Sequence, residues 1–484
     1  MSTLKQQMMS GVLYTALAKY SGIVISLVVM GVLARLLTPD DFGIVAIATV
    51  FIAFFELFTN IGFSSAIIQH KTLTPLDLSN IYSFTLWMGL GLSLLFFAAS
   101  WGIASYYDSH ALRPICQLLS LSLFLSSASM VPNTLFYRAK QFKLLAIRTL
   151  CIQLTTGATA ITAAWLGAGL YTLTIQPLLS GLLLYLISIH YHPVRPRLTF
   201  GLASIRKIWG YSMYQFLFNL INYFTRNLDK LLIGKYLGMD LLGYYEKSYR
   251  TMMLPVQNIT YVITPVLHPL LSDYQHDRQQ LRMAHEKMIH ILALIGFPLS
   301  VLSYFCASEA ILLLFGDQWQ ASVPAFQILS LTIGIQLVLS SSGSFFQSGG
   351  DTRSMFHCAL FAATVSALGL AAGVCYFKSL EAIAWCILAT FLLSFIQCYA
   401  LLYQRVFQHA ITPFLQKLTL PFAISVLLFV AMWLVHPWAE RFDTIVSLLL
   451  KGVIFILTYA LLLQLTGERQ TMSHYFRRKN RDRQ

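Results

Sequence analysis

Charged residues are scarce in this chain. Only 11% of its 484 residues are Asp, Glu, Lys or Arg, against about 25% in soluble domains. Hydrophobic residues make up 57% of the sequence, which excludes a disordered chain and argues against a single soluble core. Apolar runs of about 20 residues recur along nearly the whole length, which is the pattern of transmembrane helices.

Motifs for covalent or metal chemistry are also missing. The seven cysteines form no CxxC pair, so neither a zinc site nor a disulfide framework is indicated. His285-Glu286 is followed by His290, one residue too far for the HExxH pattern of zinc proteases. No Walker motif is present, which argues against ATP hydrolysis. We therefore expect a protein that is not an enzyme and holds no metal or cofactor, with coupling to H⁺ or Na⁺ left open.

The apolar runs predict an all-α polytopic membrane protein with about fourteen transmembrane helices. No segment between them is long enough for an extramembrane domain, so any function has to lie within the membrane. The predicted spans are 10–37, 39–68, 75–105, 112–135, 144–167, 170–191, 206–234, 240–270, 284–307, 322–346, 354–377, 380–404, 415–436 and 444–465.

The net charge of +14 follows from an excess of Lys and Arg. A polytopic membrane protein collects these residues in its cytoplasmic loops, and no basic segment is large enough to form a nucleic-acid-binding domain. Placing the N-terminus inside puts most Lys and Arg on the cytoplasmic side, including the tail at 467–484. We therefore expect both termini in the cytoplasm and no nucleic-acid partner.

Two sequence stretches carry strong helix-start signals. In Thr38-Pro39-Asp40-Asp41, threonine is at the N-cap, proline is at the first helical position and acids occupy the first turn. Thr74-Pro75-Leu76-Asp77 repeats that chemistry before the third span. Both stretches predict tight turns between adjacent helices.

The turn after the first span has a counterpart later in the chain. ARLLTPDDFG at 34–43 aligns with GKYLGMDLLG at 234–243, which pairs Gly43 with Gly243. The repeat is then six spans long, and an even number predicts two lobes related by a pseudo-two-fold axis along the membrane normal. The expected divisions are an N-lobe at 1–197, a C-lobe at 198–408, an additional helix pair at 409–466 and the basic tail at 467–484.

Polar residues in the seventh and eighth spans recur at helical spacing. Gln215, Asn219, Asn222 and Arg226 share one face of the seventh, a continuous polar stripe on a membrane helix. Subtracting 200 carries this stripe onto the first span, where it includes Lys19. A charge inside a membrane segment costs roughly 2.5–3.5 kcal/mol on insertion scales, so such residues usually pair or line a wet cavity.

The stripes predict a cationic cavity that binds the substrate. Its candidate residues are Lys19, Arg226, Lys230, Lys247 and Arg250, with Gln215, Asn219 and Asn222 beside them. The candidates for ion coupling are Glu56, Asp229 and Glu246.

A simpler interpretation of the same charges is snorkelling combined with local salt bridges. In that case Arg226 or Lys230 pairs with Asp229, and Arg250 pairs with Glu246 one turn away.

The segment LARLLTPDDFGIVAIATVFIAFFELFTNIGFSSAIIQ at 33–69 resembles the N-terminal signature of the Wzx-type polysaccharide exporters, with the closest likeness to the colanic-acid exporter branch. These proteins share a superfamily with the MATE multidrug exporters and the lipid II flippase. The resemblance implies a flippase that moves undecaprenyl-diphosphate-linked oligosaccharides between the leaflets of the bacterial inner membrane. It also implies a basic lumen and a groove near the last two spans that holds the lipid tail.

Two other functions fit an apolar chain of this length. A MATE-type exporter of drugs, driven by H⁺ or Na⁺, would favour acidic lumen residues, whereas basic residues outnumber acidic ones here. A polysaccharide polymerase or ligase would need sizeable periplasmic loops. The expected partners are the lipid-linked oligosaccharide, the bilayer and other polysaccharide-assembly proteins, and the expected state is a monomer.

Overall fold

A computed structural model describes residues 2–60, 63–70, 72–197, 201, 216, 219–220, 223–224, 226–272 and 277–468. All regular secondary structure in these ranges is helical. Contacts within the chain divide it into two compact units, Met1–Glu246 and Lys247–Gln484. The predicted division at residue 198 into two six-helix lobes is a different one and stays a prediction.

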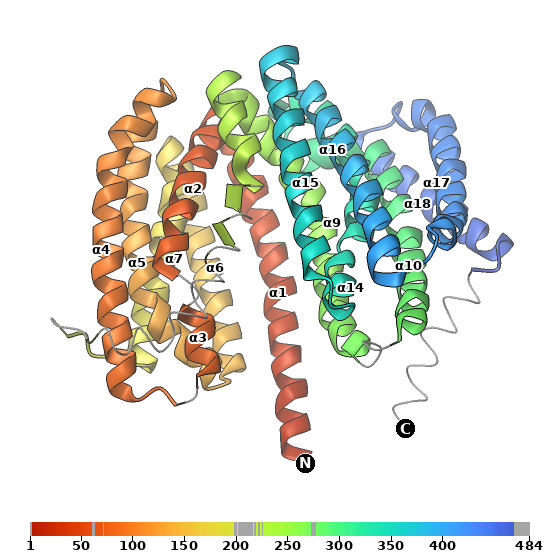
Figure 1. The fold of residues 1–484 in the computed structure, drawn as a ribbon. Helices are drawn as coiled ribbons and strands as arrows, with labels where there is room; N and C mark the ends of the chain where they lie inside the picture. The colour runs from red at the N-terminus through yellow and green to blue at the C-terminus, as the bar shows by residue number, and fades with distance from the viewer. Residues whose placement is uncertain are drawn as a thin grey trace. The chain divides into compact units, whose positions relative to one another are not determined.

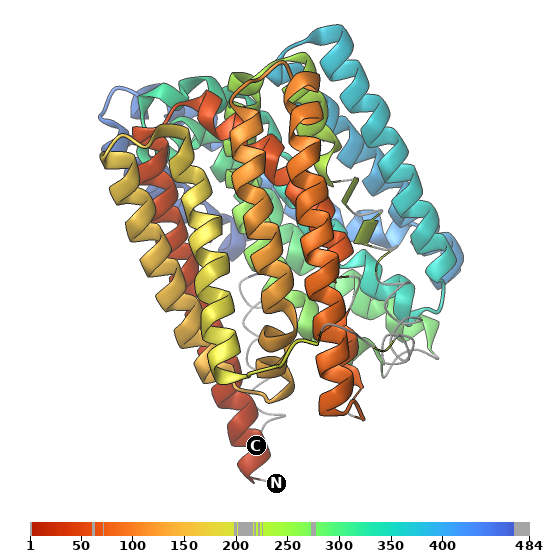
Figure 2. The same cartoon turned by 90° about the vertical axis from the view of Figure 1, so that its left-hand side faces the viewer.

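The first unit consists of long helices joined by short turns. Helix α4 packs against α5, α5 against α7, and α1 against α6; Figure 2 shows α4 to α7 running side by side. The elements are α1 (Ser2–Leu36), α2 (Pro39–Asn60), α3 (Phe63–Gln69), α4 (Pro75–Tyr106), α5 (Leu112–Arg138), α6 (Phe142–Trp165), η1 (Gly169–Tyr171), α7 (Thr172–Tyr191), a helical stretch at 226–236, and the start of α9 (Met239–Ser272).

The second unit contains the rest of α9 and all later helices. Helix α10 packs against α13 and α17, α15 against α16, and α17 against α18; Figure 1 shows α15 beside α16 and α17 beside α18. The elements are α10 (Arg278–Phe305), α11 (Ala307–Phe315), η2 (Asp317–Ser322), α12 (Val323–Ser330), α13 (Thr332–Leu339), α14 (Ser342–Ser348), α15 (Thr352–Ala371), η3 (Ala372–Phe377), α16 (Leu380–Leu401), η4 (Leu402–Phe407), α17 (Thr412–Ala439) and α18 (Thr444–Leu465).

Within the described ranges, eleven helices are long and apolar enough to cross a membrane. The number rises to twelve if 317–330 and 332–348, which meet at 46°, form one broken span. All twelve coincide with predicted spans, so the multi-pass architecture is confirmed. The predicted span 206–234 lies mostly outside the described residues, and 240–270 is helical as α9. The total of fourteen stays a prediction.

Both predicted helix starts are confirmed. The Thr38 amide donates to Asp41 Oδ2 at 2.9 Å, and the Asp41 amide donates back to Thr38 Oγ1 at 3.3 Å. Thr74 and Asp77 form the same reciprocal capping box at the start of α4. Each box satisfies amide groups that the first helical turn leaves unpaired, which fixes the turns before α2 and α4.

The two repeated glycines approach the chain at exchanged positions. A Cβ on Gly43 would lie 1.9 Å from the carbonyl oxygen of Met239, and a Cβ on Gly243 would lie 2.0 Å from that of Pro39. Pro39 and Met239 are themselves 200 residues apart and begin α2 and α9. A local two-fold relation exchanges contacts in this way. The contact supports the repeat at this position.

Candidate functional site

The charged stretch at 226–250 folds as a cross-linked hairpin. Its first arm is the helical stretch 226–236, and its second arm is the start of α9. Tyr245 OH donates to Asp229 Oδ2 at 2.6 Å. One residue further along each arm, Lys230 Nζ lies 2.8 Å from Glu246 Oε2. These two adjacent links hold the arms in register.

These links give three charged residues of the hairpin, Asp229, Lys230 and Glu246, partners within it. Glu246 pairs with Lys230 across the hairpin rather than with Arg250 along its own helix, so the predicted Arg250–Glu246 pair is wrong. Asp229 is buried and accepts from Tyr245 and from the Lys230 amide. Helical spacing relates only residues of one helix, whereas these partners lie on two different helices.

The two arginines of the stretch are in a different state. Arg226 and Arg250 are both exposed, and neither forms an ion pair within the described part of the chain. Arg226 belongs to the first unit and Arg250 to the second. Their guanidinium groups are therefore available to an external anion.

Lys247 is buried, with 2% of its surface exposed. Its ammonium group lies 5.1 Å from the centre of the Phe315 ring and 5.2 Å from that of Trp319. Both rings attract a cation through their π-faces, which stabilises the buried charge. Lys247 is thus held among aromatic rings in this conformation, and its predicted substrate contact stays a prediction.

The remaining candidates are less closely defined. Lys19 on α1 and Asn219 are half-buried, and so is Glu56 on α2. Phe54 and Phe55 directly precede Glu56 in the sequence of α2. Gln215 and Asn222 lie outside the described residues.

Two further basic residues of the described chain are buried within membrane-spanning helices, and the five candidates named from the sequence do not include them. Arg148 in α6 is buried and donates to Asn133 Oδ1 at 2.7 Å and to Ser188 Oγ at 3.0 Å. Lys451 in α18 is fully buried. Each follows an apolar stretch inside its predicted span, and that position was the signal in the sequence that could have found it.

Lys451 is part of a buried charge cluster between α18 and α11. Its ammonium group donates to the carbonyl oxygen of Phe305 at 3.0 Å and pairs with Glu309 Oε1. Ser447 Oγ donates to the same carboxylate oxygen at 2.6 Å. The cluster fixes α18 to the segment that follows α10.

An apolar groove of about 610 Å³ lies among α10, α13, α16 and α17, with Leu331 between α12 and α13 at its edge. Side chains of α17, the predicted thirteenth span, form much of one wall. Its lining is Phe297, Ser300, Val301, Leu331, Ile335, Leu388, Leu392, Phe395, Leu415, Leu418, Thr419, Phe422, Ser425, Val426 and Phe429. A groove with so few polar atoms suits a hydrocarbon chain.

Metal binding receives no support from the described residues. Among them, no three His, Cys, Asp or Glu side chains come together as a metal-binding group. His285 lies in a cluster of aromatic rings, with the Phe345 ring centre 4.7 Å away.

The chain is similar to known bacterial proteins. The chain is 27% identical over 353 residues to an uncharacterized membrane protein in the cps region of Klebsiella pneumoniae, covering 72% of each chain. It is 25% identical over 357 residues to the lipopolysaccharide biosynthesis protein WzxC of Escherichia coli (strain K12), covering 72% of this chain and 71% of WzxC.

The fold resembles that of the lipid II flippase MurJ in an inward closed conformation. The TM-score is 0.76 at 14% identity, over 95% of this chain and 100% of that one. At this identity the likeness shows a shared fold. A family model described as polysaccharide biosynthesis protein matches residues 32–324, well over half of the chain, and the chain belongs to that family.

Proposed function

We propose that this protein is a flippase that moves undecaprenyl-diphosphate-linked oligosaccharide repeat units across the bacterial inner membrane. The observation that carries the proposal is the pair Arg226 and Arg250, two exposed guanidinium groups without ion-pair partners in the described chain. The family membership and the name of WzxC support the substrate class. The product would enter exopolysaccharide, O-antigen or capsule assembly.

Arginine suits the diphosphate group of such a substrate. Its planar fork binds phosphate oxygens through two parallel hydrogen bonds, and it keeps its charge at any physiological pH. A diphosphate moved into a medium of low dielectric loses its hydration, so it needs cations and donors already in place. Lys19, Lys230 and Lys247 would add positive potential around it.

The apolar groove fits the other part of the same substrate, its lipid tail. A polyprenyl tail is an extended hydrocarbon, and the groove beside α10 and α17 is lined almost entirely by apolar side chains. A tail in this groove would stay in a hydrocarbon-like environment while the headgroup crosses. The charged and apolar features thus match the two parts of one amphipathic molecule.

The proposed mechanism is alternating access, in which two lobes rock about a central cavity and no covalent chemistry occurs. The reciprocal contact of Gly43 and Gly243 supports a two-fold relation between the starts of α2 and α9. Of the three carboxylates proposed for ion coupling, Glu56 is the only one without an ion pair or side-chain hydrogen bond in the described chain. We therefore place Glu56 first as a carrier of H⁺ or Na⁺.

A drug exporter of the MATE type would bind cationic substrates. Two unpaired arginines would repel such substrates, whereas the hairpin carboxylates Asp229 and Glu246 already have partners. The charge arrangement therefore favours the anionic lipid. We further propose a monomer with both termini in the cytoplasm, working beside other polysaccharide-assembly proteins.

The test is substitution of the two arginines in a strain that lacks the native protein. We expect Arg226→Ala and Arg250→Ala to abolish surface polysaccharide at normal protein levels, with repeat units accumulating on the inner leaflet. Lys235→Ala is the matched control, because Lys235 lies on the same hairpin but pairs with Asp108 at 3.0 Å. Unchanged polysaccharide in both arginine variants would contradict the basic-cavity proposal.

A further inference from the structure

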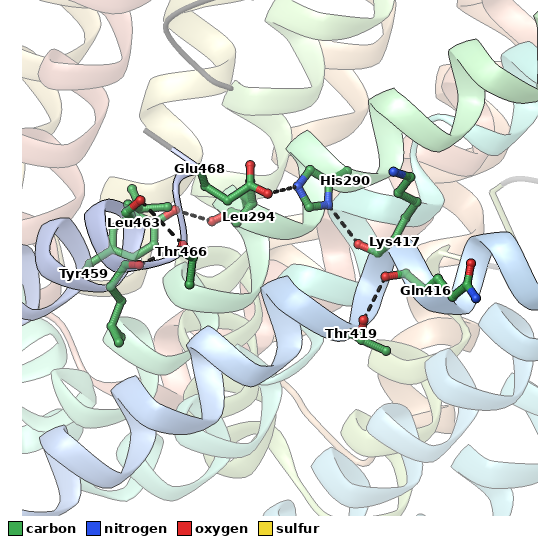
Figure 3. Close-up of polar contacts among 10 residues, drawn as sticks. His290, Leu294, Gln416, Lys417, Thr419, Tyr459, Leu463, Thr466 and Glu468 are labelled. Carbon is green, nitrogen blue, oxygen red and sulfur yellow. Dashed lines mark hydrogen bonds and ion pairs between the residues drawn. The ribbon is translucent and has the colours of Figure 1, made fainter. Parts of the chain in front are cut away.

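His290 on α10 faces two hydrogen-bond acceptors (Figure 3). Its Nδ1 lies 2.9 Å from the carbonyl oxygen of Lys417 on α17. Its Nε2 lies 3.0 Å from Glu468 Oε1, three residues beyond the end of α18. The glycine at Gly467 has a φ of 74°, a left-handed conformation that lets the chain turn after α18 and bring Glu468 to His290.

This arrangement requires one extra proton. A carbonyl oxygen only accepts, so His290 Nδ1 has to carry a hydrogen for its bond to Lys417. The second bond then exists in two forms: a protonated Nε2 donates to the Glu468 carboxylate, or a protonated Glu468 donates to a bare Nε2. Both forms hold one proton more than a neutral histidine beside a carboxylate.

Without that proton only one of the two bonds can be kept, because a neutral imidazole carries a single N–H. The lone pair on the other ring nitrogen would then face an acceptor oxygen, either the Lys417 carbonyl at 2.9 Å or Glu468 Oε1 at 3.0 Å. Only 14% of the His290 side chain and 11% of the Glu468 side chain are exposed, so little water screens the repulsion. Within the described residues, the other carboxylate oxygen, Glu468 Oε2, is buried and has no hydrogen-bond partner. The contact drawn in Figure 3 is therefore that of a protonated pair.

Among the described residues, the charged groups near His290 and Glu468 have other partners or are exposed. On α10, Glu286 pairs with Arg282 at 3.1 Å, and Lys287 is exposed. On α17, the side chain of Lys417 is exposed, and only its carbonyl group meets His290. On α18, Tyr459 donates its hydroxyl to the Leu294 carbonyl at 2.6 Å. The described structure records no ion pair from Lys287 or Lys417 to Glu468.

The same contacts join the helices that form the apolar groove. Leu415, Leu418 and Thr419 flank Lys417 on α17 and line the groove, and Phe297 lies two turns along α10 from His290. Bonds from His290 to the Lys417 carbonyl and to Glu468 therefore hold α10, α17 and the end of α18 together beside the groove. Opening them would free one wall relative to another.

We propose that His290 and Glu468 form a one-proton site that clasps the end of α18 to α10 and α17 and controls the width of the apolar groove. The link to substrate rests on the proposed function, since it takes the groove as the site of the lipid tail. Proton binding closes the clasp and loss of the proton opens it. The clasp is thus closed at low pH and opens as pH rises.

The test measures the distance between two spin labels as a function of pH. Cysteines for labelling are placed at the exposed positions Gln416 on α17 and Thr466 after α18, in full-length protein without its native cysteines, in lipid nanodiscs. We expect one narrow distance distribution near pH 5 that becomes longer or broader towards about pH 9, as the clasp loses its proton. A distribution that is identical at both ends overturns the clasp.

Two variants separate the effect of the bound proton from the effect of side-chain packing. In Glu468→Gln the amide donates to a neutral His290 without an extra proton, so the narrow distribution should persist at every pH. In His290→Phe both bonds are lost, so the broad distribution should be present at every pH. A wild-type pH response in either variant overturns the proposal.

A control comes from a second histidine–glutamate pair in the same unit. His436 Nε2 lies 3.3 Å from Glu440 Oε1, the residue that follows α17, at the end of this helix away from the clasp. His436→Phe should keep the full wild-type pH response, and loss of the response in this variant would overturn the assignment to His290.

The distance measurement needs no transport. A flat pH response would therefore reject the clasp and leave the flippase proposal standing. A normal clasp in a protein that moves no lipid-linked oligosaccharide would contradict the flippase proposal alone.

Discussion

Among the basic side chains of the described residues, some are paired with a carboxylate inside the protein and others are exposed without an ion pair. Lys230 faces Glu246, and Lys451 is buried against Glu309. Arg226 and Arg250 are exposed and have no ion pair within the described residues. A charge without a partner is costly in a membrane. We therefore expect Arg226 and Arg250 to bind an anion that is not part of the protein.

Lys451 allows a direct test of the paired group. We expect Lys451→Met to destabilise the protein by about 3–5 kcal/mol, because it leaves the buried Glu309 carboxylate without its cation. The measurement is the thermal unfolding midpoint of purified protein in detergent, compared with wild type.

The double variant Glu309→Gln with Lys451→Met is the control. It removes both charges together, so it should recover most of the lost stability. Equal midpoints for Lys451→Met and wild type would show that the pair contributes little. A double variant no more stable than the single one would show that packing matters more than charge.

At the scale of elements, the repeated turn offers the most direct test. The Gly43 and Gly243 contacts are with backbone carbonyl groups, which cannot rotate away as a side chain can. An added methyl group at either position therefore forces α2 and the start of α9 apart.

We expect Gly43→Ala and Gly243→Ala to reduce surface polysaccharide to similar degrees, because the two contacts are equivalent under the repeat. The double variant should lose far less than the sum of the two single losses, since one separation relieves both clashes. The measurement is polysaccharide per unit of membrane-inserted protein.

Helical glycines in open surroundings provide the control for that experiment. A Cβ on Gly91 or Gly102 of α4 would meet no atom within 4 Å. Alanine at either position should be neutral or slightly stabilising, because alanine favours a helix by about 1 kcal/mol over glycine. Wild-type polysaccharide in both Gly43→Ala and Gly243→Ala would refute the close contact.

At the scale of the whole molecule, features that depend on neighbouring residues of the chain could be predicted from the sequence. Apolar runs located the eleven membrane-crossing helices of the described ranges and the bent pair at 317–348, and Thr38 and Thr74 marked where two of the helices begin. The family resemblance from 33–69 is confirmed, since the family model covers 32–324. Helix propensity, capping and insertion into a bilayer all act over a few turns of chain.

Pairings between distant segments could not be predicted in the same way. Helical spacing suggested Arg250 as the partner of Glu246, whereas Lys230 on the other arm fills that place. The contact of His290 with Glu468 joins positions 178 residues apart. Such contacts depend on which helices become neighbours, and a pattern along one helix does not record that.

If Arg226 and Arg250 carry a lipid-linked diphosphate across the membrane, their loss should stop its transfer between the leaflets. The most direct measurement is transfer of a fluorescent undecaprenyl-diphosphate oligosaccharide between the leaflets of liposomes containing the purified protein, followed with a membrane-impermeant quencher. We predict that wild-type protein exposes inner-leaflet substrate to the quencher, and that the Arg226→Ala, Arg250→Ala double variant does no more than protein-free liposomes. Equal transfer by wild type and the double variant, or no transfer by wild type, would contradict the account.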